Sequence, residues 1–187
     1  MAWRDIIGSI LEASLRRTLS CIEGGDAEKC ARYLLASADA IYAPLKPIDS
    51  GLGEARRIAS LLAGIVSNSF LLTASAREGG EELIRETLRA LEGLREQAAP
   101  MDEAREILSD ANVAGFEPAV SREARETIYS DLKNYVEPPQ PPVPRRRRQP
   151  RRPDPRQAIR RALRELGRRD PVLARQVSQI LRRLGVA

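Results

Sequence analysis

Apolar residues recur every three or four positions through most of residues 1–136, a spacing that is typical of amphipathic α-helices. No segment alternates apolar and polar residues as a half-buried strand does. Glycines and prolines divide the pattern into separate segments, at Gly24, Gly25, Pro44, Pro47, Gly79, Gly80 and Pro100. The sequence therefore predicts an all-α fold in which each helix buries one face.

Four of these segments are long enough to form the core of a bundle. Their apolar stripes run through residues 7–22, 27–41, 58–76 and 83–94. The loops after the first and third segments are short, which favours antiparallel hairpins, and Asp26 is placed to cap the second helix. We expect a four-helix bundle, with shorter helices around residues 101–109 and 121–136 packed on it. Because aromatic residues make up only 4% of the chain, the core must be mainly aliphatic.

The third segment has a second interpretation. Residues 58–76 contain no charged side chain, and a membrane-spanning helix needs about 20 apolar residues. Lipid penalises the polar side chains of this stretch, which are Ser60, Ser67, Asn68, Ser69, Thr73 and Ser75. A central helix that is buried on most sides is therefore favoured, and a membrane helix is the alternative. The many small residues also permit close helix approach, inside the bundle or between subunits.

The two cysteines, Cys21 and Cys30, lie symmetrically about the turn at residues 24–26. Residues placed in this way in a helical hairpin approach each other, so a disulfide is one interpretation. Two small buried hydrophobic side chains are the other. The chain has no histidine, and two cysteines alone do not complete a metal site. No metal ion or other cofactor is expected.

The sequence offers little that supports catalysis. The absence of histidine excludes a Ser–His triad, a His-based nuclease site and a zinc site of the HExxH type. No carboxylate pair or activated nucleophile stands out, and the glycines of Gly51-Leu52-Gly53 follow no strand, so they fit a loop that begins a helix. We expect a protein that is not an enzyme, with no catalytic residues and no small-molecule substrate.

A proline-rich segment marks the end of the predicted body. Residues 137–153 begin with Glu-Pro-Pro-Gln-Pro-Pro-Val-Pro, and proline fixes φ and removes a hydrogen-bond donor. At about 3.1 Å per residue in polyproline II, the segment reaches roughly 50 Å. We interpret it as an extended linker between a body at residues 1–136 and a C-terminal arm at residues 154–187. Docking of its prolines on an aromatic groove of a partner protein is the alternative.

Matched start and stop signals predict two short helices in the arm. Asp154-Pro155 and Asp170-Pro171 each place an N-cap aspartate before a proline at the first helical position. Leu166-Gly167 and Leu184-Gly185 supply the stops, with Arg168-Arg169 as the connection. The apolar stripes of the two helices can cover each other. So small a hairpin needs a partner to become ordered: the body, a neighbouring subunit or a polyanion.

Charge is divided unequally along the chain. Residues 1–144 have a net charge of −7, whereas residues 145–187 carry 15 arginines and three acidic residues, a net charge of +12. A basic segment of this kind seeks a polyanion, and the guanidinium group binds phosphates bidentately. The candidate nucleic-acid-binding residues are Arg145, Arg146, Arg147, Arg148, Arg151, Arg152, Arg156, Arg160, Arg161, Arg164, Arg168, Arg169, Arg175, Arg182 and Arg183.

The chemistry of the arm favours double-stranded DNA, bound without regard to sequence. The arm has no aromatic residue on which single-stranded bases can stack and no separate recognition helix that reads base edges. Phosphate contacts and counterion release supply the affinity. RNA is the alternative nucleic acid. An acidic protein surface is an alternative partner, and an anionic membrane surface is a less favoured one.

The run Arg145–Arg152 and the two arm helices, attached to a helical body, resemble the DNA-wrapping coat proteins of archaeal filamentous viruses. In that family, helical coat subunits enclose DNA as paired, repeating units. The resemblance implies a structural protein of a virion that packages double-stranded DNA and assembles as a homo- or hetero-oligomer of similar helical subunits. The scarcity of Asn, Gln, Cys and Met fits a hot habitat.

A second interpretation is a cellular protein. It would be a chromatin-like component or an adaptor that tethers a DNA- or RNA-processing complex, with the arm docked on nucleic acid or on an acidic protein surface. No signal peptide is visible, because Trp3-Arg4-Asp5 interrupts any apolar segment near the N-terminus. The expected location is therefore a virion or an intracellular nucleoprotein rather than the secreted fraction.

Overall fold

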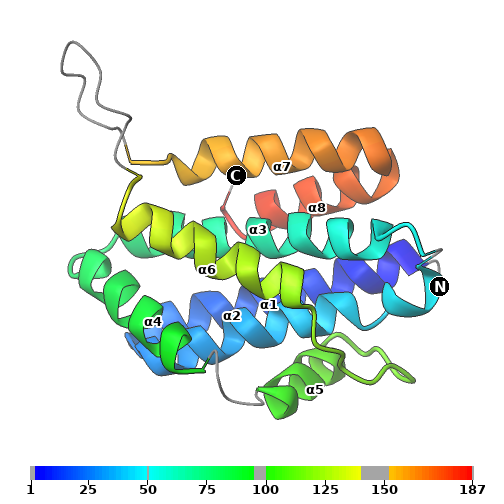
Figure 1. Ribbon diagram of the computed structural model, residues 1–187, viewed down its shortest axis with the longest axis horizontal. Helices are drawn as coiled ribbons and strands as arrows, with labels where there is room; N and C mark the ends of the chain where they lie inside the picture. The colour runs from blue at the N-terminus through cyan, green and yellow to red at the C-terminus, as the bar shows by residue number, and fades with distance from the viewer. Residues whose placement is uncertain (1–2, 50, 95–99, 140–151, 187) are drawn as a thin grey trace.

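The computed structural model describes residues 3–49, 51–94, 100–139 and 152–186. Within these ranges the chain forms eight α-helices and no strand, so the all-α prediction is confirmed, and the helices form a compact bundle (Figure 1). In chain order the elements are α1 (Trp3–Gly24), α2 (Ala27–Tyr42), the 3-10 turn η1 (Lys46–Ile48), α3 (Glu54–Ser75), α4 (Gly80–Leu94), α5 (Met101–Asp110), α6 (Arg122–Val136), α7 (Pro155–Arg169) and α8 (Pro171–Arg183).

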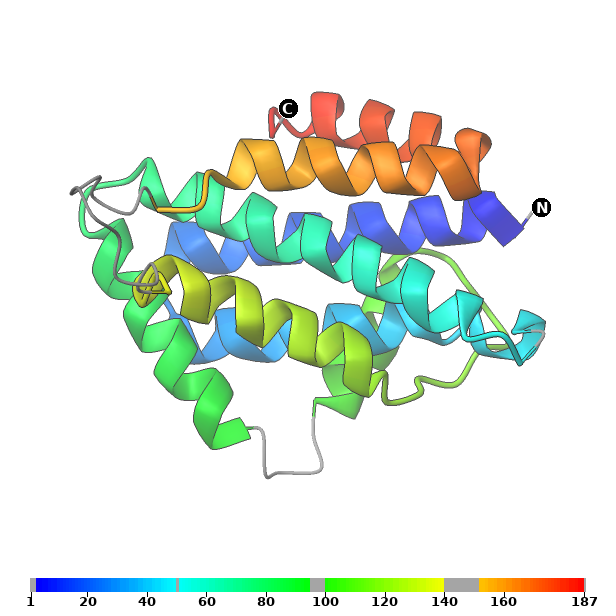
Figure 2. The same ribbon diagram turned by 45° about the horizontal axis from the view of Figure 1, so that its top comes forward.

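Helix α3 is the central element of the bundle. It packs against α1, α2, α4, α6 and α7, and Figure 2 shows it between α6 and α7. Of the described helices, it alone is long and apolar enough to cross a membrane, but 72% of its most apolar 18-residue stretch is buried by protein. Phe70 of α3 is the largest fully buried side chain of the core. These features match the expectation of a buried central helix.

Helices α1 and α2 form an antiparallel hairpin that a disulfide closes. Gly25 turns the chain in the left-handed conformation (φ 68°), and the Asp26 side chain caps α2 by accepting a hydrogen bond from the N–H of Lys29 (3.0 Å). Cys21 and Cys30 face each other across this turn, with their Cα atoms 5.3 Å apart and their sulfurs bonded. Both side chains are also buried in the core.

Removing this cross-link is expected to lower the free energy of unfolding by about 2–3 kcal/mol, the loop-closure entropy of so short a ring. The measurement is urea unfolding of the native chain and of the Cys21→Ala/Cys30→Ala variant, each with and without a reductant. The native chain should lose stability in the reductant, and the variant should not respond to it. Equal stability of all four samples would show that the hairpin closes without help from the bond.

A buried ion pair joins α2 to α6. Asp39 of α2 is fully buried, and its two oxygens accept hydrogen bonds from the guanidinium group of Arg125, with Nε 3.0 Å from Oδ1. The N–H of Ser121 donates to the same carboxylate (3.2 Å). Burial raises the pKa of the Asp39 carboxyl, and the contacts with Arg125 and Ser121 oppose this rise. The start of α6 is thereby fixed against the bundle.

The boundary between α7 and α8 differs from the prediction. Helix α7 continues through Gly167 to Arg169, so the expectation that Gly167 ends it, with Arg168 and Arg169 as a loop, is wrong. The physical reason is Asp170, whose N–H closes the last turn of α7 and whose side chain caps the first N–H groups of α8. One residue thus serves both helices. Gly185, with a φ of 71°, follows the end of α8 as predicted.

Helices α7 and α8, called the hairpin below, pack on the rest of the bundle. Helix α7 contacts α3, α8 contacts α1, and the two contact each other (Figure 2). The buried apolar side chains of the hairpin are Ile159, Leu166, Leu173, Val177, Ile180 and Leu181. The hairpin was expected to need a partner to become ordered, and in this structure it packs on the body. The predicted linker at residues 137–153 falls mostly on residues 140–151, which lie outside the described residues.

Candidate nucleic-acid interface

Ion pairs hold the α7–α8 turn of the hairpin against the starts of α1 and α3. Arg169 Nη1 lies 2.7 Å from Glu54 Oε2 of α3, and Arg4 Nε of α1 lies 2.6 Å from Asp170 Oδ2. Burial acts to raise the pKa of the Asp170 carboxyl, but hydrogen bonds from the N–H groups of α8 and from Arg4 lower it. Both pairs join residues far apart in the sequence, so they tie the hairpin to the bundle.

Two further ion pairs join arginines of the C-terminal part of the chain to acidic residues of the bundle. Arg183 Nη1 lies 3.3 Å from Glu12 Oε2 of α1. Arg152, just before α7, pairs with Glu81 of α4 and lies over the ring of Tyr135, 5.6 Å from its centroid. The hydrogen bond from Arg152 lowers the pKa of the Glu81 carboxyl. The acidic residues of the body therefore neutralise part of the basic C-terminal charge.

Six exposed arginines of the hairpin have no carboxylate partner within the parts of the chain that the structure describes, and we call them the basic face: Arg156, Arg160, Arg161, Arg164, Arg175 and Arg182. The acidic residues of the hairpin point elsewhere. Asp154 and Asp170 cap the two helices, and Glu165 Oε1 lies 3.1 Å from Arg169 Nη2. Asp154 and Glu165 nevertheless line the same hollow as Arg161, so acidic groups border the basic face there.

The spacing of these arginines suits a nucleic-acid backbone. Arg156, Arg160 and Arg164 follow one another at intervals of four residues, so they form a row with steps of about 6 Å along α7. Two nucleotides of one strand of duplex DNA rise by about 6.8 Å. Arg175 and Arg182 stand two turns apart on α8 and form a second row. Rows of guanidinium groups can contact several phosphates at once.

The structure separates the predicted nucleic-acid-binding residues into groups. Arg145–Arg148 and Arg151 lie outside the described residues. Three of the others pair with acidic residues of the body: Arg152, Arg169 and Arg183. Arg168 is 81% exposed and only 3.7 Å from its own helix neighbour Glu165, so it borders the basic face. The remaining six arginines, those of the basic face, are exposed on the two helices of the hairpin.

A groove that sequence reasoning missed runs between α6 and α7, over α3. It has a volume of about 490 Å³, and the residues that line it include Gly64, Asn68, Thr127, Asp131, Gln157 and Arg161. Asp131 accepts hydrogen bonds from Ser67 Oγ (2.5 Å) and Asn68 Nδ2 (3.1 Å). Burial raises the pKa of its carboxyl to about 6, although these two hydrogen bonds oppose the rise. The signal in the sequence was Ser67-Asn68, because polar residues in an uncharged helix require a polar partner.

Asp131→Asn is expected to stabilise the fold by about 2–3 kcal/mol at neutral pH. The folded-state pKa of about 6 lies above the value of about 3.9 for an unfolded aspartate, so the folded chain holds an extra proton between these pH values. The contribution of Asp131 to stability is therefore lost as the pH rises from about 4 to 6, and asparagine removes this loss. The measurement is urea unfolding of both chains between pH 4 and pH 8.

The two chains should be equally stable near pH 4, should diverge as the pH rises to about 6, and should differ by a constant amount at higher pH. A matched neutralisation of an exposed acid, Glu78→Gln, should leave the pH profile of the native chain unchanged. A constant difference between Asp131→Asn and the native chain at every pH would contradict the assignment, because it would reflect packing rather than titration.

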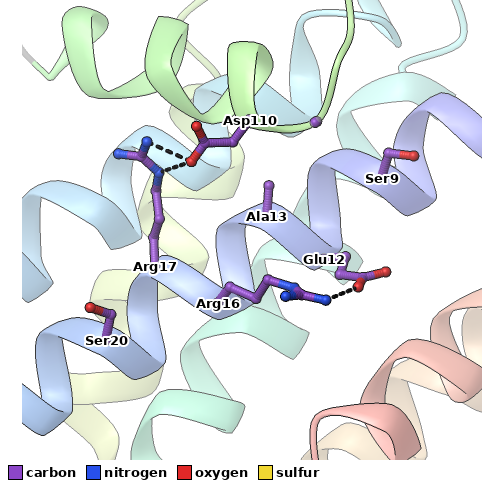
Figure 3. A pocket seen from close by; sticks show the side chains of 8 residues that line it. Ser9, Glu12, Ala13, Arg16, Arg17, Ser20 and Asp110 are labelled. Atoms are coloured by element: carbon purple, nitrogen blue, oxygen red, sulfur yellow. Dashed lines mark hydrogen bonds and ion pairs between the residues drawn. The ribbon is translucent and has the colours of Figure 1, made fainter.

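A second hollow, of about 520 Å³, lies on α1 beside α5 (Figure 3). Its charged groups are already paired: Arg17 Nη2 lies 2.5 Å from Asp110 Oδ2, and Arg16 Nη2 lies 2.6 Å from Glu12 Oε1. This hollow therefore adds no free cation to the basic face. Among the described residues, no three histidine, cysteine or acidic side chains gather as they do around a metal ion.

Comparison of the chain with protein-family models, with curated proteins and with solved structures gives no match.

Proposed function

We propose that this protein binds double-stranded DNA without sequence specificity and packages it, using the basic C-terminal part of the chain. The observation that carries the proposal is the basic face, a set of exposed arginines of the hairpin without carboxylate partners among the described residues. Residues 1–144 are acidic by comparison, with a net charge of −7. This segregation concentrates positive potential on one side of the molecule, where it attracts a polyanion.

The hairpin binds DNA while it stays docked on the bundle. Its apolar side chains are used for packing, so the outer arginines are held on a rigid support and need little ordering when they meet phosphates. Contacts to phosphates carry no sequence information, because the backbone is the same at every step. The arginines of residues 145–152 precede α7 in the sequence and extend the same charge.

The test measures binding of the full chain to duplexes of unrelated sequence across a salt series, with fluorescence anisotropy as the readout. If all six arginines of the basic face contact phosphates, the logarithm of the affinity should fall with the logarithm of salt with a slope of about −5, the same for every sequence. A matched RNA duplex decides between DNA and RNA. No binding at low salt, or binding that ignores salt, would exclude the proposal.

The packaging part of the proposal rests on the resemblance to viral coat proteins. The bundle supplies contacts between homo- or hetero-oligomeric subunits, the basic C-terminal segment follows the DNA, and the protein has no catalytic role. Its location is a virion or an intracellular nucleoprotein. Electron microscopy of the protein with long duplex DNA tests this part, because a packaging protein coats or compacts the DNA, whereas isolated bound molecules would argue against packaging.

One observation favours a second function. Glu12, Glu54 and Glu81 of the bundle already pair with arginines of the C-terminal part, so this part of the chain is suited to acidic protein surfaces as well as to phosphates. The alternative is thus an adaptor or chromatin-like protein whose basic segment docks on an acidic partner. An adaptor stays discrete on DNA and needs that partner, whereas a packaging protein assembles along the DNA alone.

A further inference from the structure

The groove between α6 and α7 contains a carboxylate that no basic side chain of the described residues neutralises. Asp131 lines the groove, and both hydrogen bonds that it accepts, from Ser67 Oγ (2.5 Å) and Asn68 Nδ2 (3.1 Å), go to the same oxygen, Oδ2. The other oxygen, Oδ1, has no hydrogen-bond or ion-pair partner among the residues that the structure describes, and solvent reaches it. One acceptor of this side chain is therefore free to bind a donor that enters the groove.

Two other aspartates show how the fold treats a buried negative charge elsewhere. Asp39 is paired with Arg125, and Asp170 is paired with Arg4. Such pairing is the rule, because neutral donors offset only part of the free energy that a carboxylate loses when it leaves water. Asp131 is half-buried and has two neutral donors only, and burial raises the pKa of its carboxyl to about 6 with no nearby charge acting on it. A positive charge placed beside Asp131 would therefore be stabilised.

The size and lining of the groove suit a short aliphatic chain. Its volume of about 490 Å³ lies within the range of about 300–1,000 Å³ that is usual for ligand sites. Leu61, Ala158 and Ala162 give part of it an apolar wall, and a second carboxylate, Asp154, lines it as well. Asp154 Oδ1 accepts the N–H of Arg156 (3.0 Å), but no basic side chain of the described residues pairs with this carboxylate. The groove thus combines two carboxylates that lack a cationic partner with an apolar wall.

The charged side chains that line the groove are acidic on balance. Helix α3 contributes no charged side chain to it, and α6 contributes only Asp131. Two acids, Asp154 and Glu165, and one base, Arg161, line it from the side of α7. Glu165 is already paired with Arg169 (3.1 Å), whereas Arg161 is exposed and makes no ion pair with any of these acids. With Asp131 ionised, the groove therefore attracts a cation and repels an anion.

An alkylammonium group fits this arrangement better than a metal ion does. Calcium takes about 6–8 oxygen ligands, whereas no three acidic side chains gather around one point within the described residues. In addition, Asp131 Oδ2 already accepts two hydrogen bonds. An ammonium group needs few acceptors, because it donates its own N–H groups, and the methylene chain that carries it packs on apolar side chains. Two separate carboxylates in one groove match two ammonium groups on one chain.

We propose that the groove between α6 and α7 binds a linear aliphatic diamine. One ammonium group donates to Asp131 Oδ1, the methylene chain lies against Leu61 and Ala162, and the second ammonium group reaches Asp154. The bound cation supplies the charge that Asp39 and Asp170 receive from arginines, so binding is strongest where Asp131 is ionised. This inference goes beyond the proposed function and does not depend on DNA binding.

The test is an NMR titration of the full chain with 1,5-diaminopentane, in about 0.1 M salt so that weak surface attraction is screened. Binding should be roughly tenfold weaker at pH 5 than at pH 8, because only about a tenth of the Asp131 carboxyl is ionised at pH 5 while both ammonium groups stay protonated. Asp131→Asn should weaken binding at pH 8 at least tenfold, since it removes the charge that holds the ammonium group. This variant is expected to be more stable than the native chain, so unfolding does not confuse the result.

Three controls separate a specific site from general attraction. Glu78→Gln removes an exposed acid that does not line the groove, and it should bind as the native chain does. The fully N-methylated diamine carries the same charges without an N–H donor, and it should bind at least tenfold more weakly. The monoamine 1-aminopentane should also bind more weakly than the diamine. Asp154→Asn, which keeps the capping oxygen, should reduce the affinity for the diamine to that for the monoamine.

Several results would overturn the inference. A native chain that does not bind the diamine at pH 8, or an Asp131→Asn variant that binds it as tightly as the native chain, would show that the groove is no amine site. Equal binding of the N-methylated diamine would reduce the effect to surface charge. Equal affinities for the monoamine and the diamine would remove Asp154 from the site and reject a diamine as its ligand. No DNA is present in these titrations, so failure here leaves the proposed function standing, and the reverse also holds.

Discussion

The variant Arg160→Ala/Arg164→Ala/Arg182→Ala is expected to bind duplex DNA roughly 500-fold more weakly near 0.1 M salt. Each lost phosphate contact reduces the salt slope by about 0.9, which corresponds to a factor of about eight in affinity at this salt concentration. The loss should be equal for duplexes of any sequence, because these side chains contact only the backbone. Anisotropy titrations over a salt series measure both quantities, and the slope should become shallower by about 2.7.

A matched variant separates a local surface from overall charge. Arg77→Ala/Arg89→Ala/Arg122→Ala removes the same number of exposed arginines from the rest of the bundle, so the net charge falls equally. We expect its affinity to change by less than about threefold, through long-range attraction alone. Equal losses in the two variants would show that no localised basic face exists. Thermal unfolding of both variants serves as the check on folding.

Substitution is a sharper experiment than deletion of the hairpin. Leu166, Leu173 and Leu181 are fully buried, so a chain that ends at residue 136 would expose part of the core that α1 and α3 share with the hairpin. Lost DNA binding in such a chain would not distinguish a missing interface from a damaged fold. The exposed arginines can be changed without touching this packing.

The positions of the helices were predictable because local signals repeat across the chain. Periodicity, together with start and stop signals in the C-terminal part, located all eight helices of the described residues. The predicted caps at Asp26, Asp154 and Asp170 each accept a hydrogen bond from the first turn of their helix. The predicted end of α7 at Gly167 was wrong, because glycine ends a helix only where the chain must turn. Asp170 makes that turn three residues later, and its N–H keeps Gly167 inside the last turn of α7.

The division of the arginines between two tasks was not predictable from the sequence. Periodicity correctly places Arg164 opposite the apolar stripe, but it does not say that Arg169 meets Glu54, 115 positions earlier. That contact depends on how α7 lies on α3, which is decided by tertiary packing. The same limit applies to Asp131, whose partners Ser67 and Asn68 are more than 60 positions away. Local patterns therefore found the basic segment, and the packing decides which part of it is free.

The variant Arg125→Met is expected to lower the free energy of unfolding by about 3–5 kcal/mol. Arg125 supplies two hydrogen bonds and the opposite charge for Asp39, which is fully buried, so its loss leaves a buried carboxylate without an opposite charge. Burial already raises the pKa of this carboxyl, and without Arg125 it should rise further. The group then takes up a proton on acidification, so the loss should be smaller at pH 5 than at pH 8. Urea unfolding at the two pH values measures both effects.

The double variant Asp39→Asn/Arg125→Met identifies the cause. Asparagine keeps an oxygen that accepts the hydrogen bond from the N–H of Ser121, and it carries no charge, so most of the lost stability should return. The pH dependence of the difference from the native chain should disappear with the charge. If the double variant were as unstable as Arg125→Met alone, the packing of the arginine stem, and not the stranded carboxylate, would be what holds α6 on α2.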